Sequence, residues 1–222
     1  KRRTALAAML AEGRRISVVE AARLFAVNSM TIRRDLQALE AEGLAVRRHG
    51  GAVAVRRIGV EFQFDHRQQR HLAAKRRIGG EAAGRIRRSQ TVVLDTGTTT
   101  LQIARALAAQ PLPCTVITSS LVIAAQLWGH RHVELMLVGG TVRPLSPDLV
   151  GPPAVAMLEK LTADLAFLGA DGLDQQRGAF AADIEAARVA EAMAKIARRV
   201  VVVADASKLG RAGAARYAAL AD

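Results

Sequence analysis

A short stretch of the sequence, LDTGTTT at residues 94–100, places a carboxylate, a glycine and three threonines directly after an apolar run. The glycine permits a ligand to approach the backbone closely. The threonines bring hydroxyl and N–H groups to the expected start of a helix, where unpaired N–H groups and the helix dipole attract anions. The stretch therefore predicts a phosphate-binding loop, although small hydroxyl residues also serve as ordinary helix caps. Its candidate effector-binding residues are Asp95, Gly97, Thr98, Thr99 and Thr100.

Four other polar or glycine-rich stretches also follow apolar runs, at residues 118–120, 139–140, 169–171 and 205–208. If these runs are parallel strands, the loops meet beyond one edge of the sheet, which is where open α/β sheets bind ligands. We therefore expect a ligand pocket at that edge. The further candidates in these stretches are Ser119, Gly139, Gly140, Asp171 and Lys208.

A second group of residues could contact nucleic acid, in the stretch TIRRDLQALEAEGL. Helical spacing puts Ile32, Leu36 and Leu39 on one apolar stripe. Arg34 falls on the opposite side with Gln37, and these are side-chain types that read guanine and adenine in the major groove. Asp35 lies near the edge of the stripe, where it could pair with an arginine. An arginine pair on an amphipathic helix is usually only a solvated face, so the neighbouring elements must decide between the two interpretations.

Those neighbouring elements predict a winged helix-turn-helix. Helical patterns cover residues 3–12 and 17–27, and a third helix begins near residue 29. Two β-prone pieces then flank Gly50 and Gly51, which indicates a hairpin. In such a domain, over residues 1–57, the third helix enters the major groove and the wing grips phosphate or the minor groove. The DNA-binding candidates are Ser29, Met30, Thr31, Arg33, Arg34, Gln37, Arg47, Arg48 and His49.

The charge of the chain supports a polyanionic partner. Its net charge is +12, and residues 1–57 alone hold 12 Lys and Arg against 5 Asp and Glu. The single cysteine, Cys114, excludes an internal disulfide and fits a reducing cytoplasm. No apolar run approaches the roughly 20 residues that span a bilayer. We expect a cytoplasmic protein with no membrane partner, no cofactor and no metal site.

The remainder of the chain predicts a second domain of the α/β class. Residues 58–88 are charged and largely helical, as expected of a helical linker that connects two domains. Beyond them, over residues 89–222, apolar strands alternate with helices, which indicates a parallel sheet covered on both faces. The expected strands are 91–95, 114–118, 133–138, 164–169 and 200–205, and the expected helices are 99–109, 120–128 and 183–198.

The motifs together resemble the DeoR family of bacterial transcription regulators. The resemblance is carried by TIRRDLQALEAEGLAVRRHGGAV, AAKRRIGGEAA, LDTGTTT, LVGGTVRP, FLGADGLD and VVVADASKLGR, in this order over nearly the whole chain. It implies a second domain similar to the ribose-5-phosphate isomerase fold, which binds a small phosphorylated metabolite. It also implies double-stranded operator DNA as a partner and a homo-oligomer, either a dimer or a tetramer. By resemblance, Arg143 belongs to the pocket, and the polyol side of the pocket contains Asp171, either Asp183 or Glu185, and Lys208.

Three positions depart from what the resemblance implies. Leu168 stands where isomerases of this fold carry an additional aspartate, and Phe180 and Ala190 replace a threonine and a lysine that are common in the family. We expect the latter two changes to make the pocket floor more apolar. The leading hypothesis is a DNA-binding repressor released from its operator by a phosphorylated sugar or related metabolite. The alternatives are a sugar-phosphate isomerase-like enzyme with an accessory DNA-binding domain, and a DNA-binding protein whose pocket is vestigial.

Overall fold

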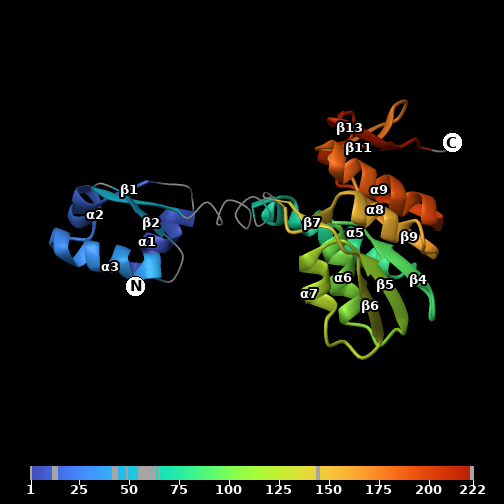
Figure 1. Cartoon of the computed structure of the whole chain (residues 1–222), viewed down its shortest axis with the longest axis horizontal. Coiled ribbons are helices and arrows are strands. Elements are labelled where there is room, and N and C mark those ends of the chain that lie inside the picture. Colours follow the sequence, from blue (N-terminus) through green and yellow to red (C-terminus); the bar gives the residue numbers. More distant parts are fainter. Residues whose placement is uncertain are drawn as a thin grey trace. The chain divides into compact units, whose positions relative to one another are not determined.

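The computed structural model describes residues 2–11, 15–41, 45–48, 50–54, 64, 66–143 and 146–220. The chain divides into two compact units, Lys1–His66 and Arg67–Asp222 (Figure 1). This boundary lies inside the segment 58–88 that the sequence assigns to a helical linker. In the part of the chain that is described, no helix is both long enough and apolar enough to cross a membrane.

The N-terminal unit consists of three helices and a small antiparallel sheet. The helices are α1 (Arg2–Ala11), α2 (Val18–Leu24) and α3 (Ser29–Ala41). The strands are β1 (Ile16–Ser17), β2 (Ala45–Arg48) and β3 (Gly51–Ala54), in the spatial order β1-β3-β2. This is the expected helix-turn-helix with a β-hairpin wing.

The apolar stripe of α3 forms the core of this unit. Ile32, Leu36 and Leu39 are each at most 1% exposed and belong to one cluster with Leu6 and Leu10 of α1. Burial of each such side chain stabilises the unit by about 1.5–3 kcal/mol. The helical period expected for α3 therefore determines which of its faces is left for a partner.

Two local features fix the path of the chain around this core. The Ser17 side chain caps α2 by accepting a hydrogen bond from the Glu20 N–H at 3.5 Å, as its position in the sequence predicts. At Gly51, a Cβ atom would lie 1.9 Å from the carbonyl oxygen of Ile16. Only glycine therefore allows β3 to pair with β1 at this point.

The C-terminal unit is built on a five-stranded parallel sheet with the order β12-β9-β4-β5-β6. Its strands are β4 (Thr91–Leu94), β5 (Cys114–Thr118), β6 (Val133–Leu137), β9 (Ala163–Gly169) and β12 (Ala197–Val203). The helices are α5 (Leu72–Ala83), α6 (Thr100–Ala108), α7 (Leu121–Leu127), α8 (Pro152–Leu158) and α9 (Ile184–Ile196). Figure 1 shows α6 and α7 on one side of the sheet and α8 and α9 on the other. The expected parallel α/β class is confirmed.

Small elements that the sequence did not predict complete this unit. They are β7 (Thr141–Val142), β8 (Leu149–Val150), β10 (Gly172–Asp174), β11 (Gly178–Ala181), β13 (Ala215–Ala218) and a turn of 3₁₀ helix, η1 (Ala206–Lys208). The strand expected to start at residue 200 begins instead at Ala197, directly after α9, because Ala197 pairs with Ala163 of β9. The two arginines that follow Ala197 concealed this start, since they interrupt the apolar run.

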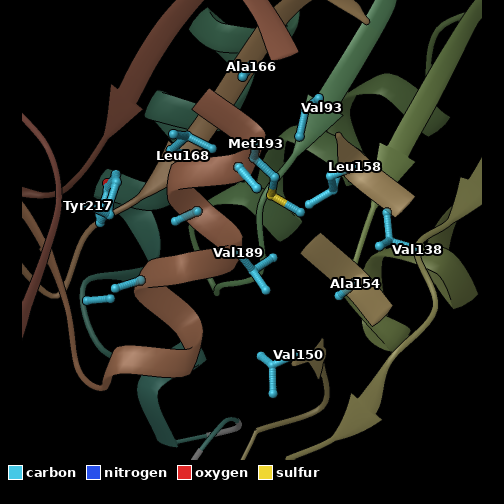
Figure 2. Packing of buried hydrophobic residues seen from close by; sticks show 14 of the residues in the cluster. Val93, Val138, Val150, Ala154, Leu158, Ala166, Leu168, Val189, Met193 and Tyr217 are labelled. Carbon is cyan, nitrogen blue, oxygen red and sulfur yellow. The ribbon is translucent and has the colours of Figure 1, made fainter. Parts of the chain in front are cut away.

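Alanines and one methionine of α9 pack against the sheet (Figure 2). Figure 2 shows Met193 directed toward Val93 of β4 and Leu158 of α8, and all three are fully buried. Leu168 of β9 is also fully buried in this cluster. The position that would carry a carboxylate in an isomerase is therefore part of the hydrophobic core.

The helix α5, which the sequence places in the linker, packs along α6 in the C-terminal unit. Their contact is close at Gly79, where a Cβ atom would lie 2.6 Å from both the Cβ and the carbonyl carbon of Gln102. The absence of a side chain at Gly79 therefore allows the two helices to approach each other.

The single tryptophan and the single tyrosine of the chain have opposite environments. Trp128 follows α7 as its C-cap residue and is 84% exposed, whereas Tyr217 of β13 is 5% exposed. The tyrosine hydroxyl donates a hydrogen bond to the carbonyl oxygen of Gly169 at 2.6 Å. Tyr217 thereby joins the small sheet to the end of β9.

Candidate functional site

The outer face of α3 presents the side chains that the sequence assigns to DNA. Met30, Arg33, Arg34 and Gln37 are exposed, on the surface left free by the buried stripe. Thr31 differs, because its N–H and hydroxyl donate to the side-chain oxygen of Asn28 at 2.8 and 2.9 Å. The Thr31 hydroxyl therefore helps to start the helix, and the exposed arginines and Gln37 remain the candidates for base contact.

Asp35 pairs with an arginine, as its position at the edge of the stripe predicts. The Arg2 Nε donates to an Asp35 carboxylate oxygen at 2.5 Å, which links α1 to α3. Asp35 therefore fixes the orientation of the helix that carries Arg33 and Arg34, and these two arginines remain free of that ion pair.

The wing is attached to the end of the same helix. The Arg47 N–H donates to the Glu40 carboxylate at 3.1 Å, and the Arg47 guanidinium lies 4.0 Å from the other Glu40 oxygen. Arg47 is exposed, so its guanidinium is accessible despite this neighbour. The Arg48 side chain and His49, both predicted to contact DNA, lie outside the described residues.

A cavity of about 190 Å³ lies at the carboxyl ends of β4, β9 and β12, where the sequence predicts the pocket. Eight of the predicted effector-binding residues line it: Asp95, Gly97, Thr98, Thr99, Thr100, Arg143, Asp171 and Lys208. Five others are absent from its lining: Ser119, Gly139, Gly140, Asp183 and Glu185. The loops after β4, β9 and β12 thus meet as expected, whereas the loops after β5 and β6 do not reach the cavity.

Asp95 joins two of the converging loops. Its carboxylate accepts hydrogen bonds from the N–H of Thr96 at 2.7 Å and from the N–H of Gly169 at 3.0 Å. Burial raises the pKa of Asp95 to about 7, and the nearby Asp148 and Asp171 act in the same direction, although the two hydrogen bonds oppose the shift. Asp95 therefore changes charge close to neutral pH, which is unusual for a carboxylate.

The threonine loop combines internal hydrogen bonds with open polar atoms. The Thr100 hydroxyl donates to the carbonyl oxygen of Gly97 at 3.1 Å, at the first turn of α6. The Thr96 hydroxyl oxygen is buried and has no hydrogen-bond partner among the described residues. In the first turn of α6, the N–H groups of Leu101 and Gln102 donate to the carbonyl oxygens of Gly97 and Thr99 at 3.1 and 3.0 Å, whereas the Thr100 N–H has no hydrogen-bond partner among the described residues. The loop is therefore suited to accept hydrogen bonds from a ligand and to donate them.

Arg143 connects three segments at the rim of the cavity. Its guanidinium makes two hydrogen bonds to Asp148, at 2.8 and 2.6 Å, and a further short one to Asp183. Burial acts to lower the pKa of Arg143, but the bonds to Asp148 and the negative charges of Asp148, Asp183 and Asp95 together outweigh it and raise the pKa. Asp183 also caps α9 by accepting from the N–H of Ala186 at 2.9 Å. Asp183 is thus a positioning residue that acts on the cavity through Arg143.

Each of the other predicted residues outside the lining has a structural contact. The Ser119 carbonyl accepts from the Leu149 N–H at 2.9 Å, and the Gly139 N–H lies 3.5 Å from the Met157 sulfur. At Gly140, a Cβ atom would lie 2.6 Å from the carbonyl oxygen of Val150. Glu185 forms an ion pair with Arg188 at 3.2 Å. The contacts of Gly140 and Glu185 account for these two residue types, whereas those of Ser119 and Gly139 are made by backbone atoms. An effector contact at these positions stays a prediction.

Sequence reasoning missed the basic residues that precede and begin α5. They are Arg67, Arg70, His71 and Lys75, all in the segment assigned to the linker. A charge run is normally a solvated face, and nothing in its spacing indicates a cavity wall. It also missed Arg211, Ser146, Ser207 and Tyr217, although Asp205 and Ser207 lie in a stretch that it singled out.

The lining carries an excess of positive charge. Five basic side chains, Arg67, Arg70, Lys75, Lys208 and Arg211, face a cavity whose lining contains the carboxylates Asp95, Asp171 and Asp205. Asp148 and Asp183 together balance Arg143. Because Asp95 is largely protonated below pH 7, the cavity favours an anionic ligand with polar groups beside it.

The two substitutions expected to change the pocket floor have different positions. Ala190 of α9 lines the cavity together with Ala181 and Ala186. Phe180 is absent from the lining, and its ring lies under the Arg177 guanidinium at 5.9 Å. The more apolar floor therefore comes from the alanines of α9 and its neighbouring strand. In the described part of the chain, no cluster of three or more His, Cys, Asp or Glu residues could hold a metal ion.

Comparison with known families matches both units. A model described as the DeoR-like helix-turn-helix domain matches residues 2–57. A model described as the DeoR C terminal sensor domain matches residues 70–222. The second model begins ahead of α5, in agreement with the packing of that helix against α6.

Full-length relatives agree with these matches. The transcriptional regulator GlpR of Haloferax volcanii is 40% identical over 192 residues, which cover 86% of this chain and 74% of that protein. The transcriptional repressor CsqR of Escherichia coli is 30% identical over 200 residues, covering 90% and 76% of the two chains. Both relatives are transcription regulators rather than enzymes.

Ribose-5-phosphate isomerases are among the solved structures that resemble part of this chain. The enzyme from Methanocaldococcus jannaschii superimposes with a TM-score of 0.46 at 20% identity, over 62% of this chain and 54% of the isomerase. The enzyme from Neisseria gonorrhoeae gives 0.46 at 16% identity, over 61% and 52%. This chain thus spans about half the length of these isomerases. With a matched domain model for each unit and regulators as its full-length relatives, the chain belongs to the DeoR family of transcriptional regulators.

Proposed function

We propose that this regulator is a repressor, and that a phosphorylated sugar or a related phosphorylated metabolite in the cavity releases it from operator DNA. The observation that carries the proposal is the basic lining of the cavity around the start of α6. Phosphate groups are recognised by helix N-termini and by basic side chains, and sugar hydroxyls by carboxylates such as Asp171 and Asp205. The name of CsqR, a transcriptional repressor, supports the direction of control.

In this proposal, double-stranded DNA is contacted by the exposed face of α3 and by the wing. Arg33, Arg34 and Gln37 read base edges or position the helix in the major groove, and Arg47, Arg48 and His49 contact the backbone beside it. Two-fold related half-sites require at least a dimer, so a dimer or a tetramer binds the operator. The regulator acts in the cytoplasm, where it meets both its DNA and its metabolite.

Release requires the metabolite to bind one arrangement of the DNA-binding units better than another. Coupling free energies of this kind are typically about 1–3 kcal/mol. The segment between the two matched domains, which continues into α5, connects the cavity to the DNA-binding unit along the chain. In this proposal, residues 1–57 bind DNA, residues 58–88 connect the two domains and residues 89–222 sense the metabolite. The helix α5 lies in the connecting range and also forms part of the pocket.

The test is binding of the full chain to the DNA directly upstream of its own gene, with phosphorylated and unphosphorylated sugars titrated into the complex. We expect one phosphorylated sugar to release the DNA while its unphosphorylated form does not. Arg34→Ala should weaken specific binding by about 1–3 kcal/mol, the value of a good base contact. Arg131→Ala removes the same charge from an exposed loop of the other unit and should leave the affinity for the operator unchanged.

Three results would count against the proposal. If the chain binds the DNA tightly and no phosphorylated compound weakens this binding, the cavity does not control DNA binding. Release by unphosphorylated sugars alone would assign the basic lining another role. Equal losses in Arg34→Ala and Arg131→Ala would return Arg34 to a solvated face of α3.

A further inference from the structure

Lys75 is an unusual residue for the inside of a protein. It lies in the first turn of α5, lines the cavity and is only 5% exposed. Its ammonium group donates a hydrogen bond to the carbonyl oxygen of Arg67 at 2.5 Å. Within the described ranges, Lys75 forms no ion pair with an Asp or Glu side chain. A buried cation without an anionic partner is unfavourable unless something else compensates it.

The charges around Lys75 increase this need. Burial lowers the pKa of Lys75, and the positive charges of Lys208, Arg67 and Arg70 lower it further, while Asp205 acts in the opposite direction. The Asp205 carboxylate is already engaged, because one of its oxygens accepts from the N–H and the hydroxyl of Ser207 at 3.0 and 2.5 Å. The surroundings of Lys75 therefore favour an added anion.

The hydrogen bond to Arg67 joins Lys75 to the start of the C-terminal unit. The Lys75 N–H also donates to the carbonyl oxygen of His71 at 3.0 Å. His71 precedes α5 in the left-handed conformation, with a φ of 55°, which residues other than glycine seldom adopt. Lys75 thus contacts both ends of the stretch 67–71, Arg67 through its side chain and His71 through its backbone; residues 67–69 of this stretch are helical and residues 70–71 form a turn. Arg67 directly follows the last residue of the DNA-binding unit.

We propose that Lys75 binds the phosphoryl group of the ligand and passes the occupancy of the cavity to the chain segment that leads to the DNA-binding unit. An ammonium group has three N–H donors, and the Arg67 carbonyl uses one of them. The other two donate to phosphoryl oxygens, whose negative charge compensates the buried cation. The ligand, Lys75 and the Arg67 carbonyl then form one connected network, which holds the stretch 67–71 in place. This inference rests on the proposed function and assigns part of it to one residue.

The experiment uses the full chain with inorganic phosphate as the probe. Calorimetric titration measures its affinity, and hydrogen–deuterium exchange measures the protection of backbone amides in residues 67–75. The variants are Lys75→Met, which keeps an unbranched side chain of similar length and removes its charge, and Arg76→Met. Arg76 is the matched control, since it is the next residue of α5, carries the same charge, is exposed and is absent from the cavity lining.

We expect phosphate to bind the wild type and to slow exchange in residues 67–75. Lys75→Met should bind phosphate about tenfold more weakly or worse, as expected when a hydrogen bond to a charged group is lost. In this variant, saturating phosphate should leave the exchange of residues 67–75 unchanged. Arg76→Met should behave as the wild type in both measurements.

Three outcomes would overturn the inference, and they differ from one another. If the wild type and Lys75→Met bind phosphate with equal affinity, Lys75 does not contact the phosphate, although the cavity still binds it. If the variant binds phosphate more weakly but phosphate does not protect residues 67–75 in the wild type, Lys75 binds the anion without coupling it to this segment. No phosphate or sugar-phosphate binding by the wild type would overturn both this inference and the proposed ligand class. If Lys75→Met does not fold, Lys75→Gln replaces it, because it keeps an N–H donor and removes the charge.

Discussion

Asp95 shows how one side chain serves the fold and the chemistry of the cavity at once. Its carboxylate accepts N–H groups from the loops after β4 and β9, and so holds together two walls of the cavity. The same burial that makes these bonds effective also disfavours the ionised form and raises its pKa to about 7. A change of pH near neutrality therefore changes the charge of the cavity.

The raised pKa of Asp95 predicts how stability depends on pH. The unfolded chain holds this proton only below its ordinary pKa of 3.8, whereas the folded protein keeps it up to about pH 7. The stabilising contribution of the proton is therefore complete below about pH 4 and is lost as the pH rises to about 7. We expect the melting temperature of the wild type to fall across this interval more steeply than that of Asp95→Asn.

Thermal melts at several pH values, compared between the two proteins, provide the measurement. Glu159→Gln, which removes an exposed carboxylate at the end of α8, is the control and should keep the pH dependence of the wild type. Parallel melting curves of wild type and Asp95→Asn between pH 4 and 7 would show that Asp95 ionises normally in the fold.

At the scale of elements, α5 is the helix whose role in the structure differs most from the role that its sequence predicts. Its sequence, LAAKRRIGGEAA, has a charge run and two adjacent glycines, which suit a solvated connecting helix. In the structure the first glycine, Gly79, lies against Gln102 of α6, and the helix delivers Lys75 to the cavity. The linker and the pocket wall are therefore the same element.

The two glycines of α5 predict opposite effects of the same substitution. An exposed Gly→Ala change within a helix normally stabilises it by about 0.5–1 kcal/mol. Gly80→Ala should do so, because nothing lies within 4 Å of an added Cβ. Gly79→Ala should destabilise the C-terminal unit instead, since its Cβ would lie 2.6 Å from the backbone of Gln102.

Denaturant melts of the two variants measure this difference, with each serving as the control for the other. Stabilisation by both alanines would mean that α5 packs more loosely on α6 than the structure describes. The result also bears on the ligand, because a displaced α5 would carry Lys75 with it.

The elements also show what the sequence can and cannot predict. The stripe of Ile32, Leu36 and Leu39 has a clear period, so the exposed face of α3 followed from it directly. The five strands of the parallel sheet were recognisable from their apolar runs, and the loops after three of them formed the cavity. Strands of two or three residues, such as β7 and β10, carry too few residues to show a period. The basic wall of the cavity depends on how α5 packs, which no local pattern encodes.

At the scale of the whole molecule, positive charge has two separate uses. In residues 1–57 it accumulates around exposed helical and wing positions, as an electrostatic footprint for DNA. In the C-terminal unit it lines the cavity, where Asp171 and Asp205 balance part of it. A net charge of +12 taken alone would have assigned all of it to nucleic acid.

This division predicts that ligand binding is separable from DNA binding. Every residue that lines the cavity belongs to the unit Arg67–Asp222. We expect a fragment of residues 58–222 to bind inorganic phosphate with the affinity of the full chain and to have no affinity for the operator. Calorimetry and a mobility-shift assay on the fragment and the full chain measure both properties. Loss of phosphate binding in a folded fragment would mean that the first unit is needed to form the site.

The opposite environments of Trp128 and Tyr217 determine which of the two side chains is the better spectroscopic probe in these experiments. Indole emission depends on contact with water, and the Trp128 ring is already surrounded by water in the folded protein. The wavelength of its emission maximum will therefore change little when the chain unfolds or binds a ligand, so Trp128 is a poor reporter of either event. Tyr217, with its ring in the cavity wall and its hydroxyl bound to Gly169, is the built-in reporter, and its ultraviolet difference spectrum will register both ligand entry and loss of the fold.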